Sequence, residues 1–203
     1  AMDTKIISQY SDGEIIYNHS VIKEPDAEQY GIHNHDVWEI IYLKNGNVSG
    51  VVGAKTYKLH KNSLIIFRPY MQHGITINKA TEYERYDIVF DETALTTGIC
   101  KKIPRNLEVI NFSANRYIAD IFAKLDYYYK NLSGEDYKIL IANTIEELIL
   151  NLSITPDDNY NSGLRELNPI IERALDFIDS NYTQTITITD ICNELFVTKS
   201  HLH

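Results

Sequence analysis

The chain has 203 residues, 44% of them hydrophobic, and carries 28 acidic against 19 basic side chains, a formal net charge of -9. This length and composition can bury a sizeable core and predict one full domain with a smaller appendage. The negative charge argues against a surface that binds nucleic acid by neutralising phosphates over the chain as a whole.

Short β-rich runs separated by Asn, Gly and Pro follow one another from Glu14 to about Asp91. Short strands with turn signals between them are typical of a β-sandwich or barrel. None of the turns is rich enough in glycine to hold a phosphate. The runs are EIIYNHSVI, VWEIIYLK, VSGVV, TYKL, SLIIF, GITI and YERYDIVF.

Two histidines and a glutamate stand close together in HNHDVWEIIYLKNG, residues 33 to 46. If this stretch is a regular strand, His33, His35 and Glu39 share one face among apolar neighbours. His73, after the buried run SLIIF and a proline turn, is a fourth candidate. Three nitrogens and one oxygen suit Zn, Ni, Fe or Mn, although the same residues could instead hydrogen-bond a hydroxylated small molecule. Both interpretations stay open here, and no cofactor is required.

Aromatic and polar residues near this stretch could complete a pocket for a sugar or another small polar molecule. Aromatic rings offer stacking faces, and a guanidinium offers a fork of donors. The alternative is ordinary surface, since the chain has 15 tyrosines and Trp38 falls opposite Glu39 in a regular strand. The ligand-binding candidates beyond the first four are Arg68, Tyr70, Trp38 and Tyr42.

The period of the apolar pattern changes from two to 3.6 after residue 112, which predicts two amphipathic helices over residues 113 to 153. The second helix carries a wide apolar stripe. This stripe either packs on the chain's own barrel or forms the interface of a homodimer, and its width alone does not separate the two. The candidate interface residues are Leu140, Ile141, Ile145, Leu148, Ile149 and Leu152.

A polar stretch with Pro, Gly, Asn and Asp covers residues 154 to 168 and predicts a linker. Beyond it, Asn168 and Pro169 are typical of a helix start, and Thr187 to Asp190 resembles a capping box that opens a second helix. A third helix begins near Thr198. Because a helix of one turn cannot dock stably, we expect the natural protein to continue beyond His203.

Residues 33 to 78 resemble the two sequence motifs of cupin barrels. The first motif matches from His33 to Gly46, whereas the second has a shorter spacing from Pro69 to His73. That spacing resembles the sensor barrels of arabinose-responsive (AraC-type) transcription regulators. The tail IIERALDFIDSNYTQTITITDICNELFVTKSHL resembles the opening of the DNA-binding domain in the same family, with Phe196 in place of a frequent glycine.

The resemblance implies an α+β chain in four parts. A cupin-like double-stranded β-helix that binds an effector would cover residues 1 to 112, and a dimerising helical hairpin residues 113 to 153. A linker over 154 to 168 would lead to a truncated helix-turn-helix segment over 169 to 203. Thr198, Lys199 and Ser200 would begin the helix that contacts DNA.

The tail itself is poor in positive charge. From residue 168 onward, Arg173 and Lys199 stand against five acidic residues, Glu172, Asp176, Asp179, Asp190 and Glu194. A groove-reading surface needs a cationic face. We therefore expect no specific DNA binding by this chain, although the full-length protein would bind DNA; a discrete gel-shift complex with the parent promoter would contradict this.

The leading hypothesis is thus the effector-sensing region of a dimeric regulator, not an enzyme. The alternative is a cupin metalloenzyme of the sugar isomerase or dioxygenase type, which explains residues 33 to 78 but nothing after residue 160. Cys100 and Cys192 lie far apart and predict no disulfide framework. No apolar run is long enough to span a membrane and no signal peptide is evident, so we expect a cytoplasmic protein without a membrane partner.

Overall fold

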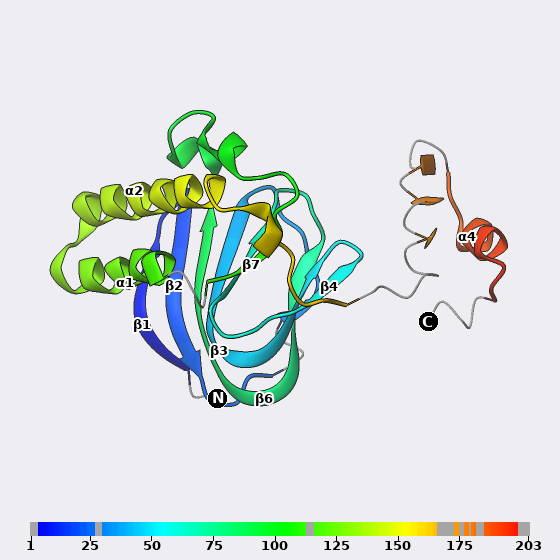
Figure 1. The fold of residues 1–203 in the computed structure, drawn as a ribbon, viewed down its shortest axis with the longest axis horizontal. Helices are drawn as coiled ribbons and strands as arrows, with labels where there is room; N and C mark the ends of the chain where they lie inside the picture. The colour runs from blue at the N-terminus through cyan, green and yellow to red at the C-terminus, as the bar shows by residue number, and fades with distance from the viewer. Residues whose placement is uncertain are drawn as a thin grey trace.

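The computed structural model describes residues 4–26, 30–112, 116–165, 173–174, 177–178, 180–181 and 185–198. The strands are β1 (Thr4–Ser11), β2 (Ile15–Ile22), β3 (Trp38–Val52), β4 (Lys55–Lys58), β5 (Ser63–Phe67), β6 (His73–Phe90), β7 (Val109–Asn111) and β8 (Leu164–Arg165). The helices are α1 (Arg116–Asn131), α2 (Gly134–Ser153) and α4 (Ile188–Leu195), with short 3-10 turns η2 (Glu92–Ala94), η3 (Ile99–Lys102) and η4 (Asp157–Asn159) (Figure 1).

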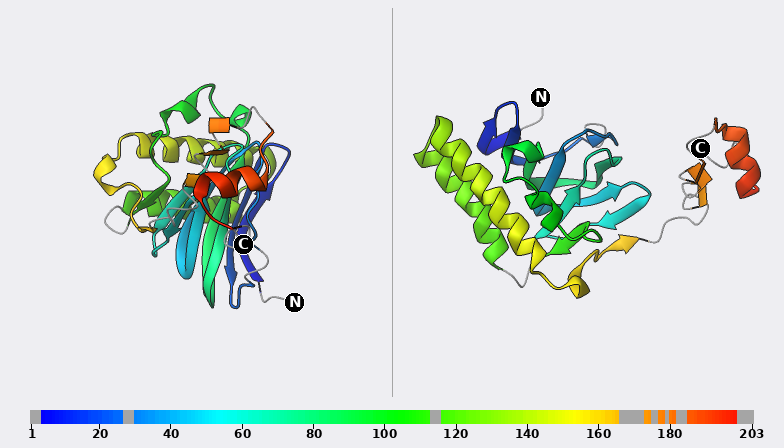
Figure 2. Two further views of the ribbon diagram at one scale, coloured as in Figure 1. Left: turned by 90° about the vertical axis from the view of Figure 1, so that its right-hand side faces the viewer. Right: turned by 90° about the horizontal axis from the view of Figure 1, so that it is seen from above.

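The strands form one antiparallel sheet in the order β1-β2-β6-β3-β4-β8, with β5 joined to β3 and β7. β3 and β6 pair along most of their length and curve strongly (Figure 1). α1 and α2 lie side by side along one side of this curved sheet (Figure 2). The strand-rich part and the two-helix hairpin that follow one another in the sequence are therefore two layers of one unit.

Two pairs of predicted strands are each a single long strand. The sequence predicts breaks at Asn45-Gly46-Asn47 and near Lys79, but β3 and β6 continue through them. The polar residues mark changes of register instead, between Leu43 and Val48. Such bulges bend and twist a strand without ending it, which is how a sheet closes on itself. β1, which has no clear apolar alternation, was not predicted.

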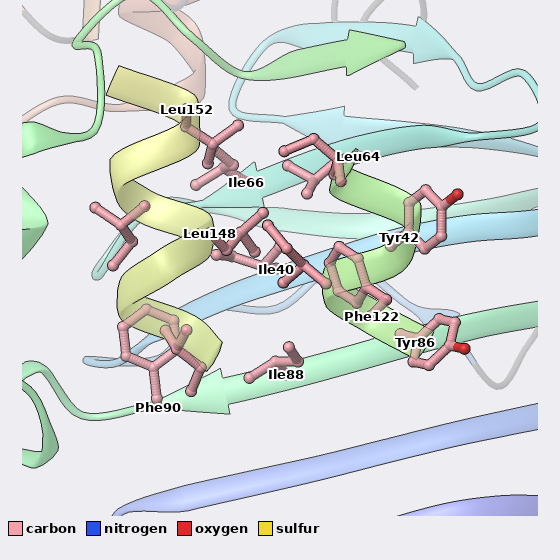
Figure 3. Close-up of a cluster of buried hydrophobic side chains, with 14 of the residues drawn as sticks. Ile40, Tyr42, Leu64, Ile66, Tyr86, Ile88, Phe90, Phe122, Leu148 and Leu152 are labelled. Atoms are coloured by element: carbon pink, nitrogen blue, oxygen red, sulfur yellow. The ribbon is translucent and has the colours of Figure 1, made fainter. Parts of the chain in front are cut away.

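The sheet buries a different set of side chains on each face. Even-numbered residues of β5, of β3 before its bulge and of the C-terminal part of β6 face the helices, where Phe122 of α1 and Leu148 and Leu152 of α2 pack on them (Figure 3). Odd-numbered residues such as Ile41, Ile65 and Tyr83 fill the concave side. This alternation follows from the period of two in a strand and separates a helix-facing core from an inner core.

The stripe predicted as a dimer interface packs on its own sheet. Ile141, Ile145, Leu148, Ile149 and Leu152 are each at most 1% exposed, while Leu140 is half-buried. The prediction that these residues form an interface between subunits is therefore wrong for the five buried ones. These five residues lie in one buried cluster with Ile40, Ile66 and Ile88 of the sheet.

Shortening Ile141 to valine should lower the free energy of unfolding by about 1 kcal/mol, because a methyl group leaves a filled core. Ile139→Val is the matched control on the same helix, since Ile139 is 49% exposed and should change stability little. Urea denaturation measures both. Equal effects of the two substitutions would contradict this packing.

The predicted linker is partly bound to the barrel. Residues 160–165, here called the strap, run back along it: Tyr160 bridges Ile110, and the β8 strand pairs with β4. Asn161 accepts hydrogen bonds from the N–H groups of Glu108 and Val109 at 2.9 and 3.0 Å. The Lys58 N–H donates to the Gly163 carbonyl at 2.8 Å. The polar composition of residues 154 to 168 predicted a linker, because composition does not reveal backbone pairings.

The C-terminal part is described over α4 and its flanks. The predicted capping box is present, with Thr187 accepting from the Asp190 N–H and the Asp190 carboxylate accepting from the Thr187 N–H. Phe196 ends α4 at φ 56°, a left-handed conformation that glycine adopts more easily. Thr198 is described, whereas the predicted helix start at Asn168 and Pro169, and Lys199 and Ser200, lie outside the described residues. No helix among the described residues is long and apolar enough to cross a membrane.

Candidate functional site

The four residues predicted as metal ligands come together on the concave side of the sheet. Glu39 lies in β3, and His73 opens β6. The backbones of His33 and His73 form a bridge in which each N–H donates to the other carbonyl at 2.9 Å. One donor atom from each of His33, His35, Glu39 and His73 lies within 4.8 Å of the others.

These four residues do not come together through one regular strand, as the sequence predicted. β3 begins only at Trp38, so His33 and His35 do not share a regular strand with Glu39. The segment before the strand crosses the start of β6 instead. It is held there by the bridge to His73 and by the Tyr70 N–H, which donates to the His35 carbonyl at 2.7 Å.

Backbone carbonyls orient the three imidazole rings. Each Nδ1 lies 2.7 to 3.0 Å from a carbonyl oxygen, which can only accept, so Nδ1 carries a proton in all three rings. The Nε2 atoms of His35 and His73 then face Glu39. In metal-binding histidines, a hydrogen bond from the nitrogen that does not bind the metal usually fixes the orientation of the ring. The carbonyl partners of His33, His35 and His73 are Gly31, Val37 and Met71.

Glu39 joins two of these rings. Its Oε2 lies 3.0 Å from Nε2 of His35 and 3.1 Å from Nε2 of His73. Burial alone would raise the pKa of Glu39, but the hydrogen bonds from His73 and His35 outweigh it and the pKa is lowered. Burial alone would lower the pKa of His73, but its bonds to Glu39 and the Met71 carbonyl raise it. Glu39 and His73 therefore each stabilise the charged form of the other.

A cavity of about 280 Å³ opens beside this group. Its lining mixes polar residues with apolar ones, among them Ile41, Phe67, Ile75 and Val89. Such a mixture is usual in sites for small molecules, where apolar walls hold the ligand and a few polar groups orient it.

Three polar residues of the cavity were missed from the sequence: Tyr30, Arg85 and Asp87. Arg85 Nε lies 3.5 Å from Asp87 Oδ2, and burial together with nearby Glu39 raises the pKa of Asp87. The signal was present in YERYDIVF, where Arg85 and Asp87, two residues apart, occupy one face of the strand. Tyr30 gives no such signal, because it lies in the irregular segment before His33.

Four of the predicted ligand-binding residues do not line the cavity. Trp38 and Tyr42 point to the helix side, where Trp38 stacks on Phe90 and Tyr42 on Phe122. Arg68 donates to the carbonyls of Leu107 and Pro104 at 2.9 and 2.8 Å and so holds a loop. Tyr70 is 77% exposed. The even-numbered positions of Trp38 and Tyr42 place them opposite Glu39, so proximity in sequence was a poor guide.

A second polar cluster lies on the helix side of β6. His19 of β2 is 2% exposed and contacts two carboxylates: its Nδ1 lies 2.9 Å from Asp126 of α1, and its Nε2 lies 2.9 Å from Glu84. Asp126 also accepts hydrogen bonds from Ser8 at 2.6 Å and from Tyr86 at 2.7 Å. This cluster ties α1 to three strands of the sheet.

Comparisons with known proteins agree with this architecture. The family model described as AraC-like ligand binding domain matches residues 21–123, just over half of the chain. The chain therefore belongs to the AraC-like ligand-binding-domain family. None of the curated proteins matches it.

Solved structures show the fold. The AraC-like transcriptional activator CuxR is 14% identical with a TM-score of 0.53, over 100% of this chain and 73% of that chain. A cupin 2 conserved barrel domain protein from Rhodopseudomonas palustris (13% identity, TM-score 0.35) covers 43% of this chain and 59% of its own. AerE from Microcystis aeruginosa (14% identity, TM-score 0.37) covers 43% of this chain and 41% of its own. At these low identities the CuxR match shows the fold alone: an antiparallel, cupin-like α+β fold.

Proposed function

We propose that this chain is the effector-sensing part of an AraC-type transcription regulator and binds a small polar molecule, such as a sugar, in the cavity beside His73. One observation carries the proposal: every residue that lines this cavity, from Tyr30 to Val89, falls inside the segment that matches the ligand-binding family. A domain of this family whose cavity combines polar and apolar lining residues has the means to recognise one small molecule.

The signal would leave the barrel through the elements that flank the cavity. An effector can shift a conformational equilibrium only if it binds one arrangement more tightly than the other. Such a difference could reach a DNA-binding part through the strap, or through the contact between His19 and Asp126 that ties α1 to the sheet. In the full-length regulator the partner would be DNA, and the regulator would act as a homodimer.

A dimer would have to use other residues than the buried stripe of α2. Side chains that the barrel leaves exposed on and after this helix include Ile139, Leu150 and Ile154, which are 49%, 49% and 78% exposed. Analytical ultracentrifugation of the chain would measure whether it dimerises.

The same cavity could hold a divalent transition metal on His33, His35, Glu39 and His73. The donor set fits: three oriented imidazoles and one carboxylate, with donor atoms within 4.8 Å. Two bonds of about 2.1 Å separate opposed donors by at most about 4.2 Å, so the most distant donors of the group would have to approach by at least about half an ångström. A bound ion would polarise oxygen atoms of the small molecule, and it would displace the protons on the Nε2 atoms that face Glu39.

The experiment is a thermal-shift screen of sugars and other small polar molecules, with and without added Zn²⁺, Ni²⁺, Fe²⁺ or Mn²⁺. A ligand at 100 times its Kd should stabilise the fold by about 2.7 kcal/mol. His35→Ala should abolish the stabilisation, whereas the control His60→Ala, at an exposed position outside the cavity, should not. A screen with no stabilising member would contradict the proposal.

The cupin metalloenzyme remains the competing function, because three histidines and a glutamate form a donor set that also serves catalysis. Stoichiometric metal by elemental analysis together with turnover of a stabilising compound would favour the enzyme. Binding without turnover favours the sensor, in agreement with the family match to a ligand-binding domain.

A further inference from the structure

Residues 104 to 108, here called the bridging loop, connect η3 to β7 and are hydrogen-bonded by two side chains from different parts of the chain. One is Arg68, whose guanidinium donates to the carbonyls of Leu107 and Pro104. The other is Asn161 of the strap. The bridging loop therefore contacts both a residue next to the candidate site and the segment that follows the helical hairpin.

The strap docks on this loop through the side chain of Asn161. Its oxygen accepts from the N–H groups of Glu108 and Val109. Its Nδ2 donates to the Asn106 carbonyl at 2.7 Å, and its backbone N–H donates to the Val109 carbonyl at 2.6 Å. Hydrogen bonds weaken steeply as their distance and angle depart from the ideal. Docking of Asn161 therefore requires the bridging loop in one particular arrangement.

Arg68 fixes that arrangement through other atoms of the loop. A guanidinium presents its donors in a rigid planar fork, so it sets the positions of both carbonyls at once. Arg68 is half-buried, and its guanidinium carbon lies 5.9 Å from the centroid of the Trp38 ring. Hydrogen bonds from a charged donor are strong, and partial shielding from water strengthens them further. The shape of the bridging loop thus depends on the position of Arg68.

Arg68 also begins the turn that leads into the candidate site. Its carbonyl accepts from the Met71 N–H at 3.2 Å. The next residue but one, Tyr70, donates from its N–H to the His35 carbonyl at 2.7 Å. The Met71 carbonyl accepts from Nδ1 of His73 at 2.7 Å. A displacement of either histidine would therefore move the backbone of this turn.

Two non-glycine residues with a left-handed backbone stand at the ends of this chain of contacts. Tyr70 has φ 66° and Asn161 has φ 58°, values that are rare for bulky side chains and less rare for asparagine. Such conformations persist where surrounding contacts enforce them. Tyr70 is 77% exposed, so its own ring supplies little of that enforcement. When contacts at one end are lost, the backbone there has a less strained arrangement to adopt.

We propose that Arg68 couples the candidate site to the strap, so that the turn of residues 68 to 71 and the strap dock and release together. This inference rests on the proposed function and deepens it: an effector that moves His35 or His73 would change how firmly the barrel holds the strap. Coupling of this kind acts equally in both directions. Arg68 does not line the cavity, and its role is that of a positioning residue.

The first test releases the strap and measures the site by residue-resolved hydrogen exchange, followed by NMR on the whole chain without an effector. Asn161→Gly removes three side-chain hydrogen bonds and accepts φ 58° without strain. It should speed exchange of the Tyr70 and His33 amides about fivefold, the low end of coupling between sites in proteins. The control Asn159→Gly, at an exposed position just before the strap, should leave both amides unchanged.

The second test removes the coupling residue. Arg68→Met should speed exchange of the Asn161 and Lys58 amides, which bind the strap to the barrel, about fivefold. Arg105→Met is the matched control, the same replacement at an exposed position of the bridging loop, and should not speed them. In the double variant of Arg68→Met with Asn161→Gly, the Tyr70 amide should exchange no faster than in Arg68→Met alone. Such non-additivity is the mark of two residues acting through one connection.

Amides in the pairing of β2 with β6 serve as the internal reference, because β3 and β6 separate β2 from β5 in the sheet. An equal rise of exchange at these amides would show general loss of stability and would overturn the coupling. An unchanged Tyr70 amide in Asn161→Gly, or additive effects in the double variant, would overturn it too. Should Arg68→Met not fold, Arg68→Lys takes its place, since a lysine keeps the charge but lacks the fork.

The results separate this inference from the proposed function. The exchange measurements need no effector, so a positive result supports the coupling even if the thermal-shift screen finds no ligand and the sensing function fails. A stabilising ligand together with independent exchange at the site and the strap would support the sensor and overturn the role of Arg68.

Discussion

Replacing Asp126 by asparagine is expected to lower the free energy of unfolding by about 3 kcal/mol, because the substitution breaks a largely buried group of hydrogen bonds to a charged acceptor. The Asp126 carboxylate accepts from Ser8 in β1, His19 in β2 and Tyr86 in β6. An amide keeps one acceptor oxygen and turns an N–H₂ group toward donors. Urea denaturation would measure the loss.

The same carboxylate should make stability depend on acid pH. Burial alone would raise the pKa of Asp126, but the hydrogen bonds from His19, Ser8 and Tyr86 lower it overall. A group whose pKa is lower in the folded than in the unfolded state stabilises fully above its unfolded pKa, about 3.9 for aspartate. The contribution is lost as pH falls through the lower folded value. Asp126→Asn should therefore flatten the acid limb of the stability curve below about pH 4.

Asp120→Asn is the matched control on the same helix. Asp120 is 63% exposed and faces Arg116 at 3.9 Å, a solvent-screened pair. Its replacement should leave both the stability and its pH dependence nearly unchanged. If the two variants behaved alike, the cluster around His19 would not anchor α1 to the sheet.

Replacing Gly163 by alanine should release the strap from the barrel, at a local cost of about 3 kcal/mol. Gly163 has φ 83°, where an L side chain costs about 1 to 2 kcal/mol, and a Cβ there would lie 2.3 Å from the Lys58 carbonyl oxygen. Backbone cannot move aside as a flexible side chain can. The pairing of β8 with β4 should open while the barrel stays folded.

Hydrogen exchange and limited proteolysis measure this release. The Lys58 and Asn161 amides should exchange faster, and cleavage should appear within residues 154 to 165. Gly98→Ala is the control, because Gly98 has φ 79° but no atom within 4 Å of its Cβ position. It carries the conformational strain without the clash. Identical behaviour of the two variants would show that the close approach to Lys58 does not hold the strap.

Apolar periodicity predicted the layers of the fold well. The change from period two to 3.6 placed α1 and α2, and SLIIF matches β5 residue for residue. Periodicity could not predict that β3 and β6 continue through polar residues, because a bulge and a turn use the same residue types. Nor could it tell which surface the α2 stripe covers, since an apolar stripe looks the same whether its partner is a sheet or a second chain.

The candidate site was predictable where its residues lie close in sequence. The spacing of His33, His35 and Glu39 drew attention to them, even though the strand assumed for the two histidines does not exist. Arg85 and Asp87 enter the cavity because β6 pairs with β3 in a register that only the folded sheet defines. In this register Asp87 lies opposite Ile41, which the sequence alone does not reveal.

β6 presents alternate residues to two different tasks. Arg85 and Asp87 face the cavity, whereas Glu84 and Tyr86 face the cluster that binds α1. Both sets of side chains are attached to one backbone, so a shift of the strand on the cavity side would also move the residues that bind α1. In the proposed sensor, the residues that recognise the effector and the residues that bind α1 would therefore alternate along a single strand. Substitutions at Arg85 and Asp87 could then change the ligand preference while Glu84 and Tyr86, which bind α1, stay the same.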